Sequence, residues 1–191
     1  NKVFKPSSKK ESVSDKTSLA PPVLFIPYEA TNSSIIDIKG YASPQSRIKL
    51  YLDNNLEKEL DTSEDGSFVV KNIELGLGTN NIFGKTVDDK GNESLSSKEV
   101  RILYDNEKPV LEITEPEDNK EVKDIKKVKI SGKTEVGAQV FVNNSQVIID
   151  SEGKFQTDMP LNNGENNFVI KAQDKASNYT EIARKVIFKP S

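Results

Sequence analysis

The 191-residue sequence contains no cysteine, no histidine and no tryptophan. Without cysteine, the chain can form no disulfide and offers no thiol nucleophile. Without histidine, a Ser-His-Asp triad and any histidine-ligated metal are excluded. Pairs of carboxylates can catalyse glycoside hydrolysis, but the acidic residues here fall in turn-like segments and on polar strand faces. We therefore predict that the chain is not an enzyme and has no cofactor.

Long apolar runs are also missing. The longest is Val-Leu-Phe-Ile at residues 23–26, far short of the ~18 residues that suggest a membrane-spanning helix. No apolar leader segment opens the sequence. We expect no membrane insertion by these residues.

Charge is nearly balanced but unevenly distributed. The net charge is −3, and residues 1–20 carry five lysines against Glu11 and Asp15. That segment is therefore +3, which leaves −6 for the rest of the chain. An acidic body argues against nucleic acid as a partner, because phosphate binding needs a basic face. Residues 1–20 are rich in lysine and serine with few large apolar side chains, which predicts a flexible tether.

One stretch of the sequence occurs twice. Five residues of the first copy recur identically 86 positions later: Asn80, Asn81, Lys85, Asp88 and Asn92 return as Asn166, Asn167, Lys171, Asp174 and Asn178. A repeat of this length is a whole small domain and not one unit of a solenoid. We predict a first domain at residues 21–105 and a second at residues 106–191.

Within each copy, apolar residues alternate with polar ones. The period of two is that of half-buried antiparallel strands, as in Ile36 and Ile38, or Val140 and Val142. About seven such segments per copy, separated by turn signals, indicate an immunoglobulin-like (Ig-like) sandwich. The predicted fold is all-β: two tandem Ig-like antiparallel β-sandwich domains after a disordered N-terminal tether.

The repeated motifs carry a family resemblance. Each copy has an acidic residue, Gly, any residue and Phe, then Leu-x-x-Gly-x-Asn and a later Asp-x-x-x-Asn; the first copy begins these at Asp65, Leu75 and Asp88. This pattern resembles the bacterial Ig-like repeats of secreted and cell-surface proteins, in particular domain B of glucodextranase. The resemblance implies spacers, stalks or accessory modules. The second copy departs from the pattern at Ser177, which stands where the first has Gly91.

Two polar loops are candidate metal sites. Asp88, Asp89 and Asn92 follow one strand, and Asp174 and Asn178 follow its repeat. Carboxylate and amide oxygens are the ligands that calcium prefers, so one hypothesis is a calcium site in each loop. The alternative is a turn held by side chain to backbone bonds, which suits Asp followed by Gly or Asn.

A second candidate site involves aromatic rings, on which sugars commonly stack. Tyr28, Tyr41 and Tyr51 belong to the first domain and could form a small ligand platform. The alternative is that they lie half-buried at the rim of the sandwich, as amphipathic tyrosines often do. For Asn80 and Asn166 we predict a structural role, with their amides tying a bend to a neighbouring strand.

These observations lead to one predicted function and two alternatives. The chain is predicted to be a non-enzymatic, monomeric spacer or adhesion segment of a bacterial surface or secreted protein. The first alternative is an accessory carbohydrate-binding module of a polysaccharide-degrading enzyme. The second is a protein-interaction module that uses an edge strand. The partner is thus an unidentified protein or glycan, and the location is extracellular or cell-surface, with any signal or anchor outside this sequence.

Overall fold

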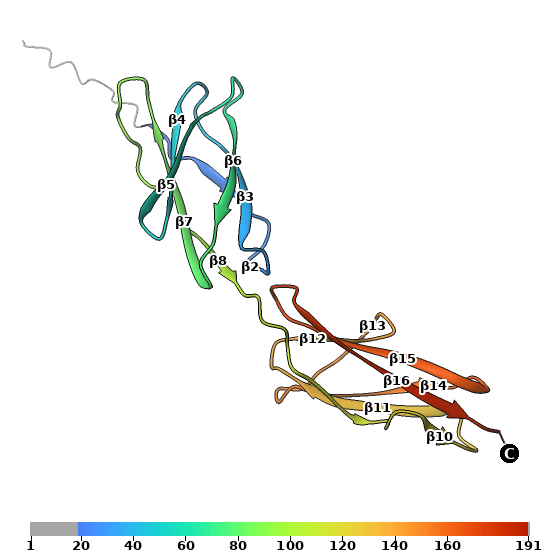
Figure 1. The fold of residues 1–191 in the computed structure, drawn as a ribbon. Helices are drawn as coiled ribbons and strands as arrows, with labels where there is room; N and C mark the ends of the chain where they lie inside the picture. Colours follow the sequence, from blue (N-terminus) through green and yellow to red (C-terminus); the bar gives the residue numbers. More distant parts are fainter. Residues whose placement is uncertain (1–18, 191) are drawn as a thin grey trace, which may run out of the picture.

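The computed structural model describes residues 19–190, and every regular element in that range is a β-strand. Figure 1 shows two sandwiches following each other end to end along the chain. The prediction of two tandem Ig-like β-sandwich domains is confirmed. Residues 1–18 of the predicted tether lie outside the described residues. None of the residues from 19 to 190 forms a helix long and apolar enough to cross a membrane.

The first sandwich is built from eight strands in two sheets. One sheet has the order β1-β3-β6 and the other the order β2-β8-β7-β4-β5. The strands are β1 (Val23–Phe25), β2 (Ala30–Thr31), β3 (Ile35–Tyr41), β4 (Arg47–Leu52), β5 (Asn55–Asp61), β6 (Ser67–Glu74), β7 (Gly78–Val87) and β8 (Val100–Tyr104).

The second sandwich repeats this plan. Its sheets have the orders β14-β11-β9 and β10-β16-β15-β12-β13. The strands are β9 (Leu111–Glu115), β10 (Lys120–Val122), β11 (Lys127–Thr134), β12 (Gln139–Val142), β13 (Ser145–Val147), β14 (Lys154–Pro160), β15 (Gly164–Gln173) and β16 (Tyr179–Phe188). The sequence predicted about seven strands per domain, and the additional ones include the short β2 and β10, which pair in parallel with β8 and β16.

Each domain has its own core between its two sheets. In the first, buried side chains come from alternate positions of facing strands, such as Ile38 on β3 and Ile48 on β4. In the second, Ile130 on β11 and Val140 on β12 hold the same places. The alternation in sequence therefore translates directly into an inner apolar face and an outer face on every sheet.

A glycine opposite a phenylalanine recurs in both cores. Gly40 on β3 pairs with Phe68 on β6, and Gly132 on β11 pairs with Phe155 on β14. A Cβ on Gly40 would lie 2.3 Å from the Phe68 ring and 2.5 Å from the carbonyl oxygen of Val23. The missing side chain therefore makes the space that the ring fills.

Both domains contain the same tight hairpin turn. Asp53 and Asn54 join β4 to β5 with φ values of 47° and 67°, and Asn143 and Asn144 join β12 to β13 with the same values. Two consecutive residues with positive φ form the type I′ turn that suits the twist of a hairpin. Asn and Asp tolerate this conformation better than most residues.

The predicted structural role of the repeated asparagines is confirmed. The Asn80 side chain accepts a hydrogen bond from the Gly76 N–H and donates to the carbonyls of Gly76 and Gly78. Asn166 makes the same three bonds with Asn162 and Gly164. Both side chains are buried, so each amide fixes the bend that leads into the central strand β7 or β15.

Candidate functional site

The first candidate calcium loop, between β7 and β8, is a turn closed by its own side chains. The Asp88 carboxylate accepts hydrogen bonds from the backbone N–H groups of Lys90 and Asn92 and from the Asn92 side-chain amide at 2.8 Å. These bonds, that of the Asn92 side chain first, lower the pKa of the Asp88 carboxyl. Its contribution to folding is therefore present at neutral pH and is lost as the pH falls through the folded-state pKa.

The second loop, between β15 and β16, has the same geometry. Asp174 accepts from the backbone and the side-chain amide of Asn178, both at 2.8 Å. Ser177 adopts a φ of 73°, close to the 82° of Gly91 at the equivalent position of the first loop. The replacement of glycine by serine thus leaves the turn unchanged but places an L side chain in the left-handed region.

Exchanging these two residues should shift stability in opposite directions. We expect Ser177→Gly to stabilise the second domain by roughly 0.5 to 1 kcal/mol, because glycine adopts positive φ without steric strain. Gly91→Ser should destabilise the first domain by a similar amount, because a Cβ there meets no atom within 4 Å and only the backbone conformation opposes it. Thermal unfolding followed by circular dichroism measures both. Equal shifts of the same sign would contradict the explanation.

The second loop and the start of β16 make two contacts that the first domain lacks: they hold the linker between the domains, residues 105–109. The Asn178 amide donates to the carbonyl oxygen of Asp105 at 2.8 Å, and the Thr180 hydroxyl donates to that of Pro109 at 2.6 Å. Asn178 is buried, whereas Asn92 at the equivalent position is exposed. Both ends of the linker are therefore fastened to the second domain.

The hydrogen bonds within the two turns bear on the hypothesis that these loops bind calcium. Asp88 and Asp174 each use their carboxylate oxygens for turn hydrogen bonds, and Asp89 is exposed beside the first turn. In residues 19–190, no group of three or more acidic side chains gathers that could hold a metal ion. The contacts are those of the turn alternative, and calcium binding by these loops stays a prediction.

The structure places the three candidate tyrosines on separate surfaces. Tyr41 ends β3 in the three-stranded sheet, and Tyr51 lies on β4 in the five-stranded sheet. Tyr28 lies between β1 and β2, where it lines a groove of about 620 Å³ together with Gln139 and Gln173 of the second domain. Burial and the nearby Asp37 raise the pKa of the Tyr28 hydroxyl.

The partner of Tyr51 is a ring that the sequence analysis did not single out. Tyr51 stacks on Phe83 of the neighbouring strand β7, with ring centroids 4.9 Å apart and planes 6° apart. The Lys85 ammonium lies 5.8 Å from the Tyr51 ring centre and pairs with Glu93 at 3.0 Å. Because each ring covers one face of the other, this pair resembles a packed surface cluster more than an open platform.

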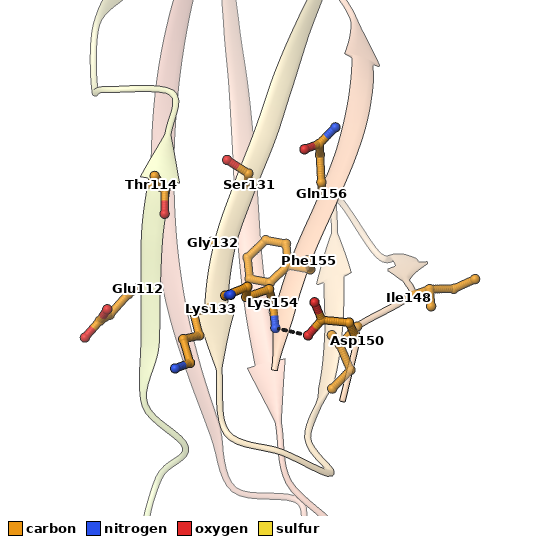
Figure 2. A pocket seen from close by; sticks show the side chains of 11 residues that line it. Glu112, Thr114, Ser131, Gly132, Lys133, Ile148, Asp150, Lys154, Phe155 and Gln156 are labelled. Atoms are coloured by element: carbon orange, nitrogen blue, oxygen red, sulfur yellow. Dashed lines mark hydrogen bonds between the residues drawn. The ribbon is translucent and has the colours of Figure 1, made fainter. Parts of the chain in front are cut away.

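The second domain carries a shallow groove on its three-stranded sheet. It has a volume of about 620 Å³ and lies over the outer face of β9, β11 and β14, beside the segment with Ile148 and Asp150 (Figure 2). Its sheet side chains are polar or charged, among them Glu112, Ser131 and Lys133. Figure 2 shows no aromatic ring other than Phe155, which is buried in the core. The groove offers hydrogen-bonding groups from the sheet and one strongly exposed apolar side chain, Ile148, at its side.

The matching surface of the first domain is different. Val23 and Phe25 on β1, Tyr41 on β3 and Val69 on β6 are all exposed on the outer side of the three-stranded sheet, the two rings at 62% each. In the sequence, residues 23–26 form one apolar run. Their signal for an exposed pair is that Val23 and Phe25 alternate with Leu24 and therefore face outward together.

The folded domains belong to a class that is typically non-catalytic, the Ig-like and fibronectin-III-like sandwiches. Residues 109–189, within the second domain, match the family model described as glucodextranase, domain B. The resemblance to bacterial Ig-like repeats predicted from the sequence is thereby confirmed.

Two known proteins illustrate the similarity. The chain is 29% identical over 151 residues to bacillopeptidase F of Bacillus subtilis (strain 168), which covers 78% of this chain but only 10% of that protein. Its fold is similar to that of the CbhA fibronectin(III)-like modules of Clostridium thermocellum, with a TM-score of 0.64 at 17% identity over 88% of this chain and 94% of that one. The chain thus spans about a tenth of the length of the relative it matches.

Proposed function

We propose that the chain is a non-enzymatic spacer or adhesion segment of an extracellular bacterial protein. The observation that carries this proposal is the fastened linker, because a spacer must keep its domains apart in a defined direction. The two bonds from Asn178 and Thr180 hold both ends of the linker to the second domain. In this proposal the two rigid units are residues 21–105 and 106–191.

Further support comes from the family. The resemblance is to repeats of secreted and cell-surface proteins, and the relative bacillopeptidase F is far longer than the matching region. Both fit a module that serves a larger extracellular protein. The edge-strand alternative stays a prediction; β5 and β13 are two of the end strands of the four sheets.

The rigidity of the linker can be tested in solution. Residual dipolar couplings measured on the full chain should fit one alignment tensor for both domains. The double variant Asn178→Ala with Thr180→Val should give two different tensors, because the linker loses both side-chain bonds. Both domains of the double variant should stay folded, and the dispersion of the amide signals in its NMR spectrum reports this.

The matched control is Asn92→Ala. It removes the same bond within the loop, to Asp88, but touches no linker residue, so the single tensor should remain. Two tensors in the unchanged protein would contradict the spacer function. So would hydrolytic activity that disappears with one Asp or Glu substitution.

A further inference from the structure

A group of side chains on the first domain forms a regular, exposed grid. We define the first-domain outer face as six residues in two cross-strand rows: Val23, Tyr41 and Ser67 in one row, and Phe25, Lys39 and Val69 in the next. The large apolar members are exposed by 66% at Val23, 62% at Phe25 and Tyr41, and 42% at Val69. Single exposed apolar residues are normal, but a contiguous group on one sheet marks an interaction site.

The second domain provides an internal comparison. Gly132 lies opposite Phe155 as Gly40 lies opposite Phe68. These two pairs define which positions of the two three-stranded sheets are equivalent. The six matching residues, defined as the second-domain outer face, are Glu112, Lys133, Lys154, Glu115, Ser131 and Gln156. All six are polar or charged. The fold therefore does not need apolar side chains at these positions, and those of the first domain require another explanation.

The size of the face limits what it could bind. A stable protein–protein interface involves roughly 20–30 residues on each side. The first-domain outer face has six residues on three short strands, so a protein partner or a second copy of the chain would gain little from it. A ligand that lies flat and is only a few atoms wide suits it better.

Its chemistry points to sugars. Two exposed aromatic rings can stack on the apolar faces of sugar rings. Lys39, which lies opposite Phe25 and two residues from Tyr41 on β3, can donate to hydroxyl groups. Phe25 and Tyr41 are diagonal neighbours on adjacent antiparallel strands, a relation in which the residues lie roughly 7–8 Å apart and aromatic side chains come within reach of each other. Among residues 19–190, no partner is found for the Lys39 ammonium or the Tyr41 hydroxyl, so both are available to a ligand.

We propose that the first-domain outer face binds a β-linked polysaccharide, with Phe25 and Tyr41 stacked on successive sugar faces. β-1,4-Linked chains are extended, and cellulose is a flat ribbon whose apolar sugar faces can lie against exposed rings on a sheet. Lys39 donates hydrogen bonds to the hydroxyl groups along the ribbon. This binding goes beyond the spacer function and does not depend on it, because none of the six residues takes part in the bonds that hold the linker.

The experiment uses the full chain and two probes, insoluble cellulose in sedimentation and soluble xylan in affinity electrophoresis. Binding to at least one probe is expected. Phe25→Ala and Tyr41→Ala should each weaken it, and the double variant should weaken it at least roughly tenfold, a change equivalent to about 1.4 kcal/mol. Both side chains are exposed, so folding should be unaffected, and circular dichroism verifies this.

The matched control lies on the second domain. Lys133→Ala with Gln156→Ala changes the equivalent positions of Tyr41 and Val69 and should leave binding unchanged. No binding to either probe would overturn the proposal, as would binding that the double variant retains. Self-association of the unchanged chain that the double variant abolishes would also overturn it and would assign the face to a second copy. Dipolar couplings should be the same in all these variants, which keeps this test separate from that of the spacer function.

Discussion

Gly40→Ala is expected to lower the free energy of unfolding of the first domain by about 3 kcal/mol. The new Cβ would lie 2.3 Å from the Phe68 ring and 2.5 Å from the carbonyl oxygen of Val23, so β1 or the ring must move. Gly132→Ala should have a similar effect on the second domain, where the closest atom is the carbonyl oxygen of Glu112 at 2.2 Å. Guanidinium titration followed by circular dichroism measures both losses.

The control for these substitutions is Gly76→Ala. A Cβ on Gly76 meets only the Asn80 side-chain oxygen, at 3.9 Å, and the residue has no positive φ. It should change the stability of the first domain by less than about 1 kcal/mol. If Gly40→Ala were equally mild, the close approach of β1 to β3 would not be a constraint on the fold. Each variant should alter the unfolding of its own domain only.

Asn80→Ala is expected to cost the first domain about 2 to 3 kcal/mol, and Asn166→Ala should cost the second domain a similar amount. Each amide satisfies a backbone N–H and two carbonyls of the bend at once. Removing it leaves those groups without partners near a buried strand end. Thermal unfolding of the single variants measures the loss.

Asn167→Ala is the matched control for Asn166→Ala. Asn167 is exposed, and the Asn143 side chain bonds to its backbone carbonyl and not to its side chain. Removing the Asn167 side chain should therefore be nearly neutral. Asn80→Asp gives a second test, because a carboxylate would face the carbonyls of Gly76 and Gly78 instead of donating to them. It should destabilise more at neutral pH than in acid. Equal effects of Asn166→Ala and Asn167→Ala would refute the conclusion that the Asn166 amide stabilises the bend before β15.

Much of the fold was predictable because its signals are local. The alternation of Ile36 and Ile38 defines a strand with one buried face, and the 86-residue repeat defines the second domain. The hairpin turn at Asp53 and Asn54 was missed, although two residues that tolerate positive φ are a recognised turn signal. The short β2 was missed for a different reason. Its parallel pairing with β8 depends on residues more than 70 positions apart, and two residues carry no period.

The candidate surfaces were less predictable. The motif from Asp88 to Asn92 suggested either a metal site or a turn. Only the positions of the surrounding N–H groups in the structure show which hydrogen bonds the Asp88 carboxylate accepts. The three tyrosines looked equivalent in sequence, yet Tyr41 and Tyr51 belong to different sheets. Phe25 became a candidate only when its neighbour across the strands was known. Side-chain grouping across strands is set by register, which a single sequence does not contain.

The parallel pairing of β10 with β16 has a mechanical consequence. β10 lies near the start of the second domain and β16 ends it, with Lys120, Glu121 and Val122 opposite Val186, Ile187 and Phe188. Tension along the chain pulls these two strands in opposite directions along their own axes. The bonds between them are therefore loaded together in shear and must yield together, whereas the strands of a hairpin can unzip one bond at a time. The first domain has the same arrangement in β2 and β8, so in both domains a stretching force loads one parallel pair of strands in shear.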